Sequence, residues 1–216
     1  MADVVAHGAA SSPVVAEAAF RGAVSFWLAG HGGTPAADDD GRTDRRTLAD
    51  LVARERPALV AGISYGAHQV ARWASAGLPP YVERLVLVMP AWTGAPDATA
   101  AATAAQADEF ARVGVDAALR RILDDHPGWV ADALAASWPL HDRDGIVAAL
   151  RAVAASTAPS DHELAAIAVP TTVVALASDP LHPEGVARRW AAAIPCSRLV
   201  VTTARSLADL GAAARG

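Results

Sequence analysis

Residues 59–68 read LVAGISYGAH, and this stretch decides the fold. Its apolar first part predicts a buried strand, and a helical pattern of apolar residues begins directly after Gly66. The Gly-x-Ser-x-Gly pattern lies at the join, where a sharp turn would present Ser64 at the tip of a sheet. The residues two before and two after the serine must be small, because the backbone folds back on itself there. The alternative is a glycine-hinged turn with an incidental serine.

The order of strand followed by helix recurs along the chain. Six short apolar runs predict strands, and helical patterns separate them. The runs are 3–6, 23–28, 58–61, 84–89, 169–176 and 198–203. This alternation predicts an α/β fold with a doubly wound, mostly parallel sheet of about six strands.

One block interrupts the alternation after the fourth predicted strand. Residues 96–165 carry helical periodicity and no strand-like run. We expect this block to form a helical cap on the functional edge of the sheet. The core domain would then consist of residues 1–95 and 166–216.

The composition of the chain limits the kinds of partner and compartment that we expect. All 18 basic residues are arginine, and 23 acidic residues bring the net charge to −5. Scattered arginines indicate a bacterial, high-GC origin rather than a nucleic-acid surface. Cys196 is the single cysteine, which excludes an internal disulfide and fits a reducing compartment. With no secretory signal and no membrane-length apolar run, we expect a cytoplasmic monomer or homodimer that binds a small-molecule substrate, not nucleic acid or a membrane.

Ligands of such sheets bind at the carboxyl ends of the strands. The loops that follow the predicted strands are therefore the places to search for a site. They contain His7-Gly8-Ala9, Gly30-His31-Gly32, Ser64, Trp92 and the run from Asp179 to Pro183.

In this order the motifs resemble the α/β-hydrolase superfamily, which includes serine esterases, lipases, lactonases and thioesterases. The matching motifs are HG at 7–8, GHG at 30–32, GISYG at 62–66, and a strand opened by VPT at 169–171 and closed by DPLHP at 179–183. The resemblance covers nearly the whole chain. It implies that Ser64 is a nucleophile, that Asp179 is the acid, and that the backbone N–H groups of Tyr65 and Ala9 form an oxyanion hole. Without the resemblance, Asp179 would be equally well explained as a turn residue before Pro180.

One part of the family pattern is missing. The family carries its general base on the loop after the last strand, but no histidine follows His182 in this chain. A serine needs a base to accept its proton. His182 lies three residues after Asp179 and is the best substitute, although it can also be explained as a residue at a helix N-terminus beside Pro183.

The other histidines have more ordinary interpretations. His68 is expected to be a buried, hydrogen-bonded residue of the helix after Ser64. His7 and His31 match positions that shape loops in the family. The remaining three, in or near the helical block, are solvated by default: His126, His141 and His162.

Trp92, Trp129 and Trp138 are candidates to line an apolar substrate pocket beneath the expected cap, although most tryptophans at helical spacing belong to the core. Asp142-x-Asp144-Gly145 lacks the further oxygen ligands of a calcium loop, so we predict no metal. Gly30-x-Gly32-Gly33 is not followed by the helix of a dinucleotide fingerprint, so we predict no cofactor.

Three functions fit these observations. The first is hydrolysis of a small carboxylic ester, lactone or thioester through an acyl-enzyme on Ser64. The second is a non-hydrolytic reaction on the same fold, such as that of a cyclase or lyase. The third is binding of a small molecule by a catalytically inactive protein. The retained GISYG favours the first, and the missing tail histidine favours the others.

Overall fold

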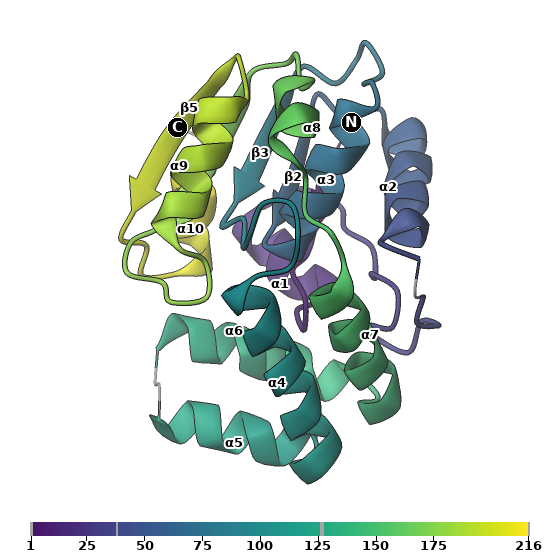
Figure 1. The fold of residues 1–216 in the computed structure, drawn as a ribbon, viewed down its shortest axis with the longest axis vertical. Helices are drawn as coiled ribbons and strands as arrows, with labels where there is room; N and C mark the ends of the chain where they lie inside the picture. The colour runs from purple at the N-terminus through teal and green to yellow at the C-terminus, as the bar shows by residue number, and fades with distance from the viewer. Residues whose placement is uncertain (1, 38, 126–127, 216) are drawn as a thin grey trace.

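The structure is a computed structural model that describes residues 2–37, 39–125 and 128–215. Five parallel strands form one sheet in the order β1-β2-β3-β4-β5. Figure 1 labels three of them, β2, β3 and β5. They are β1 (Val4–Ala6), β2 (Leu59–Ile63), β3 (Arg84–Val88), β4 (Thr171–Leu176) and β5 (Ser197–Thr202). The predicted α/β fold with a parallel sheet is confirmed.

The sheet has one strand fewer than the six apolar runs suggested. Residues 23–28 join β1 only through a single parallel bridge between Val4 and Val24. Further along the run, the backbone N–H of Leu28 donates to the ring nitrogen Nε2 of His7 at 3.2 Å. The run leaves the sheet after one bridge because a side chain, not a neighbouring strand, satisfies its backbone.

The path of the chain reverses its direction across the sheet at β1. After β1 the chain passes to the outer side of this strand at Val24, and then returns to form β2 on its inner side. Ligands of doubly wound sheets bind where the direction of winding reverses, at the carboxyl ends of the strands. The loops after β1 and β2 meet at this point.

Helices cover both faces of the sheet (Figure 1). Alternate strand residues point to opposite faces and enter two separate apolar clusters. One cluster joins the sheet to α2 (Arg42–Glu55), α3 (Tyr65–Ser75), α8 (Asp161–Ala165) and α9 (Glu184–Ala193). The other joins it to α1 (Pro13–Ala19) and α10 (Leu207–Arg215).

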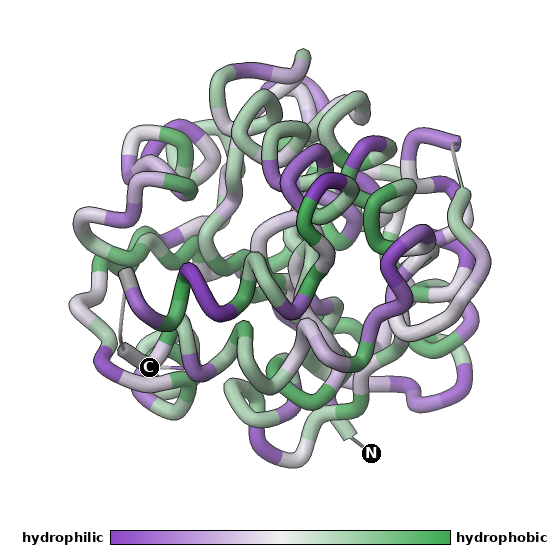
Figure 2. Tube along the Cα trace, turned by 90° about the horizontal axis from the view of Figure 1, so that it is seen from below, coloured by the Kyte–Doolittle hydropathy of each residue, from purple (hydrophilic) through white to green (hydrophobic). Residues whose placement is uncertain are grey.

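A third group of helices lies beyond the carboxyl ends of the strands, at the bottom of Figure 1. It consists of α4 (Ala98–Val113), α5 (Val115–Asp125), α6 (Trp129–Ser137), a short 3₁₀ turn (Trp138–Leu140) and α7 (Arg143–Ala155). Seen from this side, hydrophilic and hydrophobic stretches alternate along the chain (Figure 2). The apolar faces form a cluster of their own around Phe110, Trp138 and Leu150. We call residues 96–159, which contain these helices, the helical segment.

The turn between β2 and α3 has no room for side chains at its two glycines. A Cβ on Gly66 would lie 2.4 Å from the carbonyl oxygen of Ala6 and 2.5 Å from that of His7. A Cβ on Gly62 would lie 2.4 Å from the carbonyl oxygen of Gly66. The expected requirement for small residues therefore has a physical cause, which is direct packing of backbone against backbone.

We predict that Gly66→Ala lowers the free energy of unfolding by about 1–3 kcal/mol, the usual cost of extra atoms in a packed interior. Urea denaturation measures this value. Gly185→Ala is the matched control, because Gly185 lies in α9 and a Cβ there would meet nothing within 4 Å. The control should raise the free energy of unfolding by about 0.4–1 kcal/mol. Equal stability of the two variants would contradict the packing argument.

Candidate functional site

Ser64 occupies the turn between β2 and α3 in a strained conformation, with φ 54° and ψ −119°. Residues other than glycine rarely adopt positive φ, and such conformations cost on the order of 1–3 kcal/mol. The Ser64 N–H donates to the carbonyl oxygen of Val88 at 2.8 Å, which fastens the turn to β3. The turn places the serine at the carboxyl edge of the sheet.

Ser64, His182 and Asp179 form a continuous chain of hydrogen bonds. Nε2 of His182 lies 2.9 Å from Oγ of Ser64, and Nδ1 of His182 lies 2.8 Å from Oδ2 of Asp179. Because a carboxylate only accepts hydrogen bonds, the ring carries its proton on Nδ1. Nε2 is then free to accept the proton of the Ser64 hydroxyl. The side chains of His182 and Asp179 are 17% and 14% exposed, so water is largely excluded.

Asp179 also holds the backbone of its own loop. Its second oxygen, Oδ1, accepts hydrogen bonds from the N–H groups of Leu181 (2.8 Å) and His182 (3.3 Å). Burial raises the pKa of Asp179, but the hydrogen bonds from His182 and Leu181 outweigh it and hold the pKa below its ordinary value. The two interpretations of Asp179, as a turn residue and as the partner of a histidine, are therefore compatible.

The N–H groups of Tyr65 and Ala9 belong to the start of α3 and to the loop after β1. Tyr65 is the first residue of α3, so its N–H has no acceptor within the helix. Within the described part of the chain, neither N–H donates a hydrogen bond to another residue. The loop of Ala9 closely approaches the serine, since a Cβ on Gly8 would lie 3.2 Å from the Cβ of Ser64. Two unused donors beside Ser64 can stabilise negative charge on a bound group.

Asp44 is a buried residue of the site that sequence reasoning missed. Its two oxygens accept from the Tyr65 hydroxyl (3.2 Å) and from the Ala29 N–H (2.8 Å). Asp44 thereby connects the side chain of Tyr65 to the loop that follows residues 23–28. Burial raises the pKa of Asp44 above its ordinary value. In the sequence it belongs to an acidic run that resembles a solvated loop, and only its place in the first turn of α2 distinguishes it.

The predicted roles of His7, His31 and His68 agree with their positions. All three are fully buried, and Nε2 of each accepts a backbone N–H. His7 accepts from Leu28 at 3.2 Å, His31 from Ala10 at 3.1 Å, and His68 from Ala91 at 3.1 Å. His31 therefore fixes the residue next to Ala9.

The prediction of a solvated His141 is wrong. Its Nδ1 accepts the Gly32 N–H at 3.1 Å, and its ring packs edge-to-face against His31 at 5.4 Å and Trp27 at 5.7 Å. The side chain comes from the helical segment but is buried among core loops, a long-range contact that no local pattern reveals. His162 is exposed, as expected, and His126 lies outside the described residues.

All three tryptophans proposed for a substrate pocket lie in or against apolar clusters. Trp92 is 2% exposed and packs edge-to-face on His68 at 4.6 Å. Trp138 is fully buried and packs on Phe110 at 4.7 Å. These are the contacts of core residues, and a role in a pocket stays a prediction.

Within residues 2–37, 39–125 and 128–215, no group of three or more His, Cys, Asp or Glu side chains has the arrangement of a metal site. None of the described helices is both long and apolar enough to cross a membrane.

Comparisons with known proteins agree with this architecture. The sequence pattern of a family described as the alpha/beta hydrolase fold matches residues 29–204. No curated protein matches the chain.

Many solved structures are similar in fold. An enol-lactonase from Burkholderia xenovorans LB400 has 18% identity and a TM-score of 0.73, with 95% of this chain and 84% of the other covered. An esterase from Exiguobacterium antarcticum has 16% identity and a TM-score of 0.71, with coverages of 93% and 83%. BpoC from Mycobacterium tuberculosis H37Rv, a candidate non-heme bromoperoxidase, has 24% identity and a TM-score of 0.68, with coverages of 98% and 86%. At these identities the likeness shows the fold alone.

The buried histidines predict a loss of stability in mild acid. Burial lowers the pKa of His31 and His141 to about 4, and that of His68 to about 3, from the ordinary 6.5. Between these values and 6.5 the unfolded chain binds more protons than the folded protein does. The stability is therefore complete above about pH 6.5 and falls as the pH decreases toward 4.

We expect the free energy of unfolding to decrease by at least about 2 kcal/mol from pH 7.5 to pH 5, because one pKa unit is worth about 1.4 kcal/mol per group. Urea denaturation across this range measures it. His68→Gln should reduce the proton uptake on unfolding by about one, because the buried ring is neutral in the folded protein. A stability that is flat over this range would show that the imidazoles are not held neutral.

Proposed function

The chain belongs to the α/β-hydrolase fold family, and from this premise we propose that it is a serine hydrolase of small carboxylic esters, lactones or thioesters. The observation that carries the proposal is the hydrogen-bonded chain from Ser64 through His182 to Asp179. The two unused N–H groups beside Ser64 support it further. The enol-lactonase and the esterase among the similar structures are consistent with this substrate class.

The first half of the reaction forms an acyl-enzyme. Oγ of Ser64 attacks the carbonyl carbon of the substrate while its proton passes to Nε2 of His182. The N–H groups of Tyr65 and Ala9 stabilise the negative charge on the carbonyl oxygen, and each such donor typically lowers the barrier by about 3 kcal/mol. The C–O or C–S bond then breaks, and the leaving group takes the proton from His182.

The second half releases the acid. A water molecule attacks the acyl carbon and gives a proton to Nε2 of His182, and Oγ of Ser64 leaves with that proton. Asp179 stays ionised throughout, which fits its lowered pKa. Its charge stabilises the imidazolium that forms in each half.

The helical segment serves in this proposal as the cap of the substrate site. Helices α4 to α7 lie beyond the carboxyl ends of the strands, where substrate has to bind (Figure 1). The loop of His182 and the turn of Ser64 lie at the same edge. A cap in this position excludes water from the acyl-enzyme and contributes the wall of the substrate pocket.

One observation supports hydrolysis over the two alternative functions. A cyclase, a lyase or an inactive binding protein was suggested by the absence of a histidine after β5. With Nε2 of His182 at 2.9 Å from Oγ of Ser64, a base is available from another loop.

We predict that p-nitrophenyl butyrate is hydrolysed and that Ser64→Ala lowers kcat by about 10⁶, the usual loss of a serine nucleophile. A fluorophosphonate should label the wild-type protein at Ser64, as mass spectrometry of the labelled peptide would show. Ser75→Ala, at the far end of α3, is the matched control and should keep both turnover and labelling. Labelling that persists in Ser64→Ala would exclude this serine as the nucleophile.

A second prediction separates the two partners of Ser64. His182→Ala should lower kcat by about 10⁶, as in serine triads without their histidine. Asp179→Asn should lower kcat by about 10⁴, because an amide no longer fixes the proton on Nδ1. His162→Gln is the control for His182, and steady-state kinetics measure all three. If His182→Ala retained a tenth of the activity, the base would lie elsewhere.

A further inference from the structure

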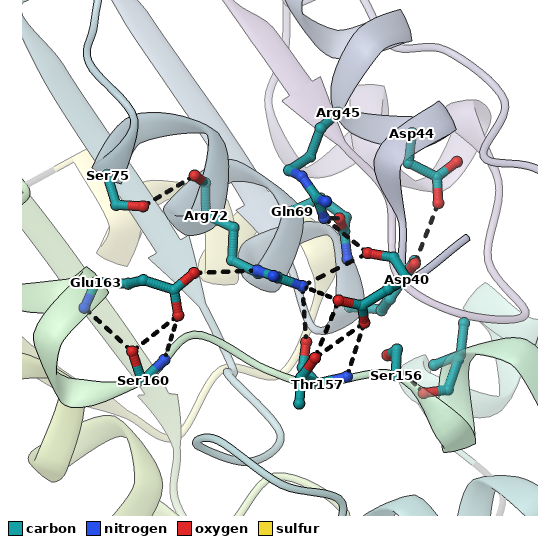
Figure 3. Close-up of polar contacts among 12 residues, drawn as sticks. Asp40, Asp44, Arg45, Gln69, Arg72, Ser75, Ser156, Thr157, Ser160 and Glu163 are labelled. Carbon is teal, nitrogen blue, oxygen red and sulfur yellow. Dashed lines mark hydrogen bonds and ion pairs between the residues drawn. The ribbon is translucent and has the colours of Figure 1, made fainter. Parts of the chain in front are cut away.

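Charged residues tie the end of the helical segment to the core (Figure 3). Oδ1 of Asp40 accepts hydrogen bonds from the N–H (2.9 Å) and the hydroxyl (3.0 Å) of Thr157. Oδ2 of Asp40 accepts from Nη1 of Arg72 at 2.7 Å. We call these three residues and Glu163 the Asp40 cluster. It joins residues that are 117 positions apart in the chain.

Arg72 is the member that connects the cluster to the site. It lies in the last turn of α3, the helix that begins directly after Ser64. Its Nη1 also donates to the carbonyl oxygen of Thr157 at 3.4 Å, and its Nε donates to Glu163 at 3.3 Å. The Arg72 side chain is 19% exposed and that of Asp40 is 42% exposed, so water is excluded from the guanidinium side of the pair more than from the carboxylate side.

The backbone of Asp40 is held so that its carboxylate faces Thr157. Asp40 and Gly41 adopt consecutive positive φ values of 56° and 73°. Nη1 of Arg45 donates to the carbonyl oxygen of Asp40 at 2.9 Å and to Oε1 of Gln69 on α3 at 2.8 Å. The strained turn is therefore secured on α3 independently of Thr157.

Thr157 lies where the helical segment returns to the core. It follows α7 by two residues, and Ala158 and Pro159 pair with the incoming connection at Gly94. The Ala158 N–H donates to the Gly94 carbonyl oxygen at 2.8 Å, and the Gly94 N–H donates to the Pro159 carbonyl oxygen at 3.1 Å. Both connections of the segment are thus joined to each other, and the Asp40 cluster fixes the pair on α3.

We propose that Asp40 and Arg72 are positioning residues that hold the helical segment in register over Ser64 and so determine how tightly substrate binds. This inference rests on the proposed function of the site. Because α3 carries Ser64 at its start and Arg72 in its last turn, one rigid element positions both the nucleophile and the wall above it. Substrate binds more tightly when the helices that contact it are already ordered. No part of the binding free energy is then needed to order these helices.

Dissolved ions can reach the cluster. A surface pocket of about 420 Å³ lies beside it, lined by Asp39, Asp40, Arg42, Arg45 and Arg72. Ion pairs that face such a pocket are weakened by added salt. High ionic strength should therefore loosen the helical segment in the wild-type protein, in the same direction as substitution of Asp40.

The test measures hydrogen exchange at the Gly94 and Ala158 amides, which bond across the two connections and not to Asp40. Asp40→Asn and Arg72→Gln should each accelerate this exchange about ten- to a hundredfold, the range that corresponds to loss of a hydrogen bond to a charged group. Asp161→Asn is the matched control. It breaks a nearby pair with Arg189 whose side chains are 54% and 57% exposed, and exchange should stay within about threefold.

Kinetics with p-nitrophenyl butyrate give the second readout. In both variants KM should rise about tenfold while kcat stays within about twofold, because chemistry on the bound substrate is unchanged. The KM of the wild-type protein should rise toward the values of the variants when the salt concentration is molar. Faster exchange with a raised KM supports the inference.

Unchanged exchange in both variants overturns the inference, whatever the activity. Faster exchange with a lowered kcat and a constant KM overturns it as well, since substrate binding would then be independent of the cluster. If the wild-type protein hydrolyses no ester, the proposed function fails. In that case the exchange rates alone support or overturn the role of the Asp40 cluster in holding the helical segment.

Discussion

The site depends on the contact of one backbone with another, that of Gly66 with the carbonyl groups of Ala6 and His7. Because no side chain separates them, the loop after β1 reaches the turn that carries Ser64. The loop that contains Ala9 is thereby brought close to the turn that contains Ser64 and Tyr65. A steric constraint at one residue thus determines the geometry of both the serine and the candidate oxyanion donors. The strain at Ser64 is tolerated because the Ser64 N–H is bonded to β3 and Gly66 packs against the end of β1.

Neutral imidazoles also hold the loop after β1 in place. His7 and His31 pack edge-to-face at 5.2 Å, and each accepts a backbone N–H that would otherwise be buried without a partner. His141 completes this group from the helical segment. The rings can accept these hydrogen bonds only while they are unprotonated, so the same burial that shapes the loop lowers their pKa values. Packing between these rings therefore connects the loop after β1 to the helical segment, in addition to the covalent connection through the chain.

The features that could be predicted from the sequence are those encoded by neighbouring residues. The turn at residues 62–66, the strands β1 to β5 and the pairing of Asp179 with a histidine three positions later all depend on short spacings. Residues 23–28 look like a strand in composition, but His7 takes the backbone donor that a strand would have used. Asp44, Asp40 and His141 acquire their contacts from segments far away in the chain. The local sequence does not distinguish Asp40 and His141 from solvated residues, and it distinguishes Asp44 only by its place in the first turn of α2. Sequence patterns thus located the elements of the site, whereas long-range packing determined what surrounds them.

The spacing of Asp179 and His182 has a mechanical consequence. One carboxylate both fixes the turn of the loop, through Oδ1, and orients the imidazole, through Oδ2. A displacement of this loop therefore moves acid and histidine together and leaves the distance between them unchanged. The distance from Nε2 of His182 to Oγ of Ser64 is the contact that such a displacement alters. The loop after β5, where the family carries its histidine, instead accepts a hydrogen bond from Nε1 of Trp129 to the carbonyl oxygen of Ala204 at 3.0 Å. With the histidine on the loop after β4, the loop after β5 is free to anchor α6, and the helical segment gains an attachment that does not constrain the proposed base.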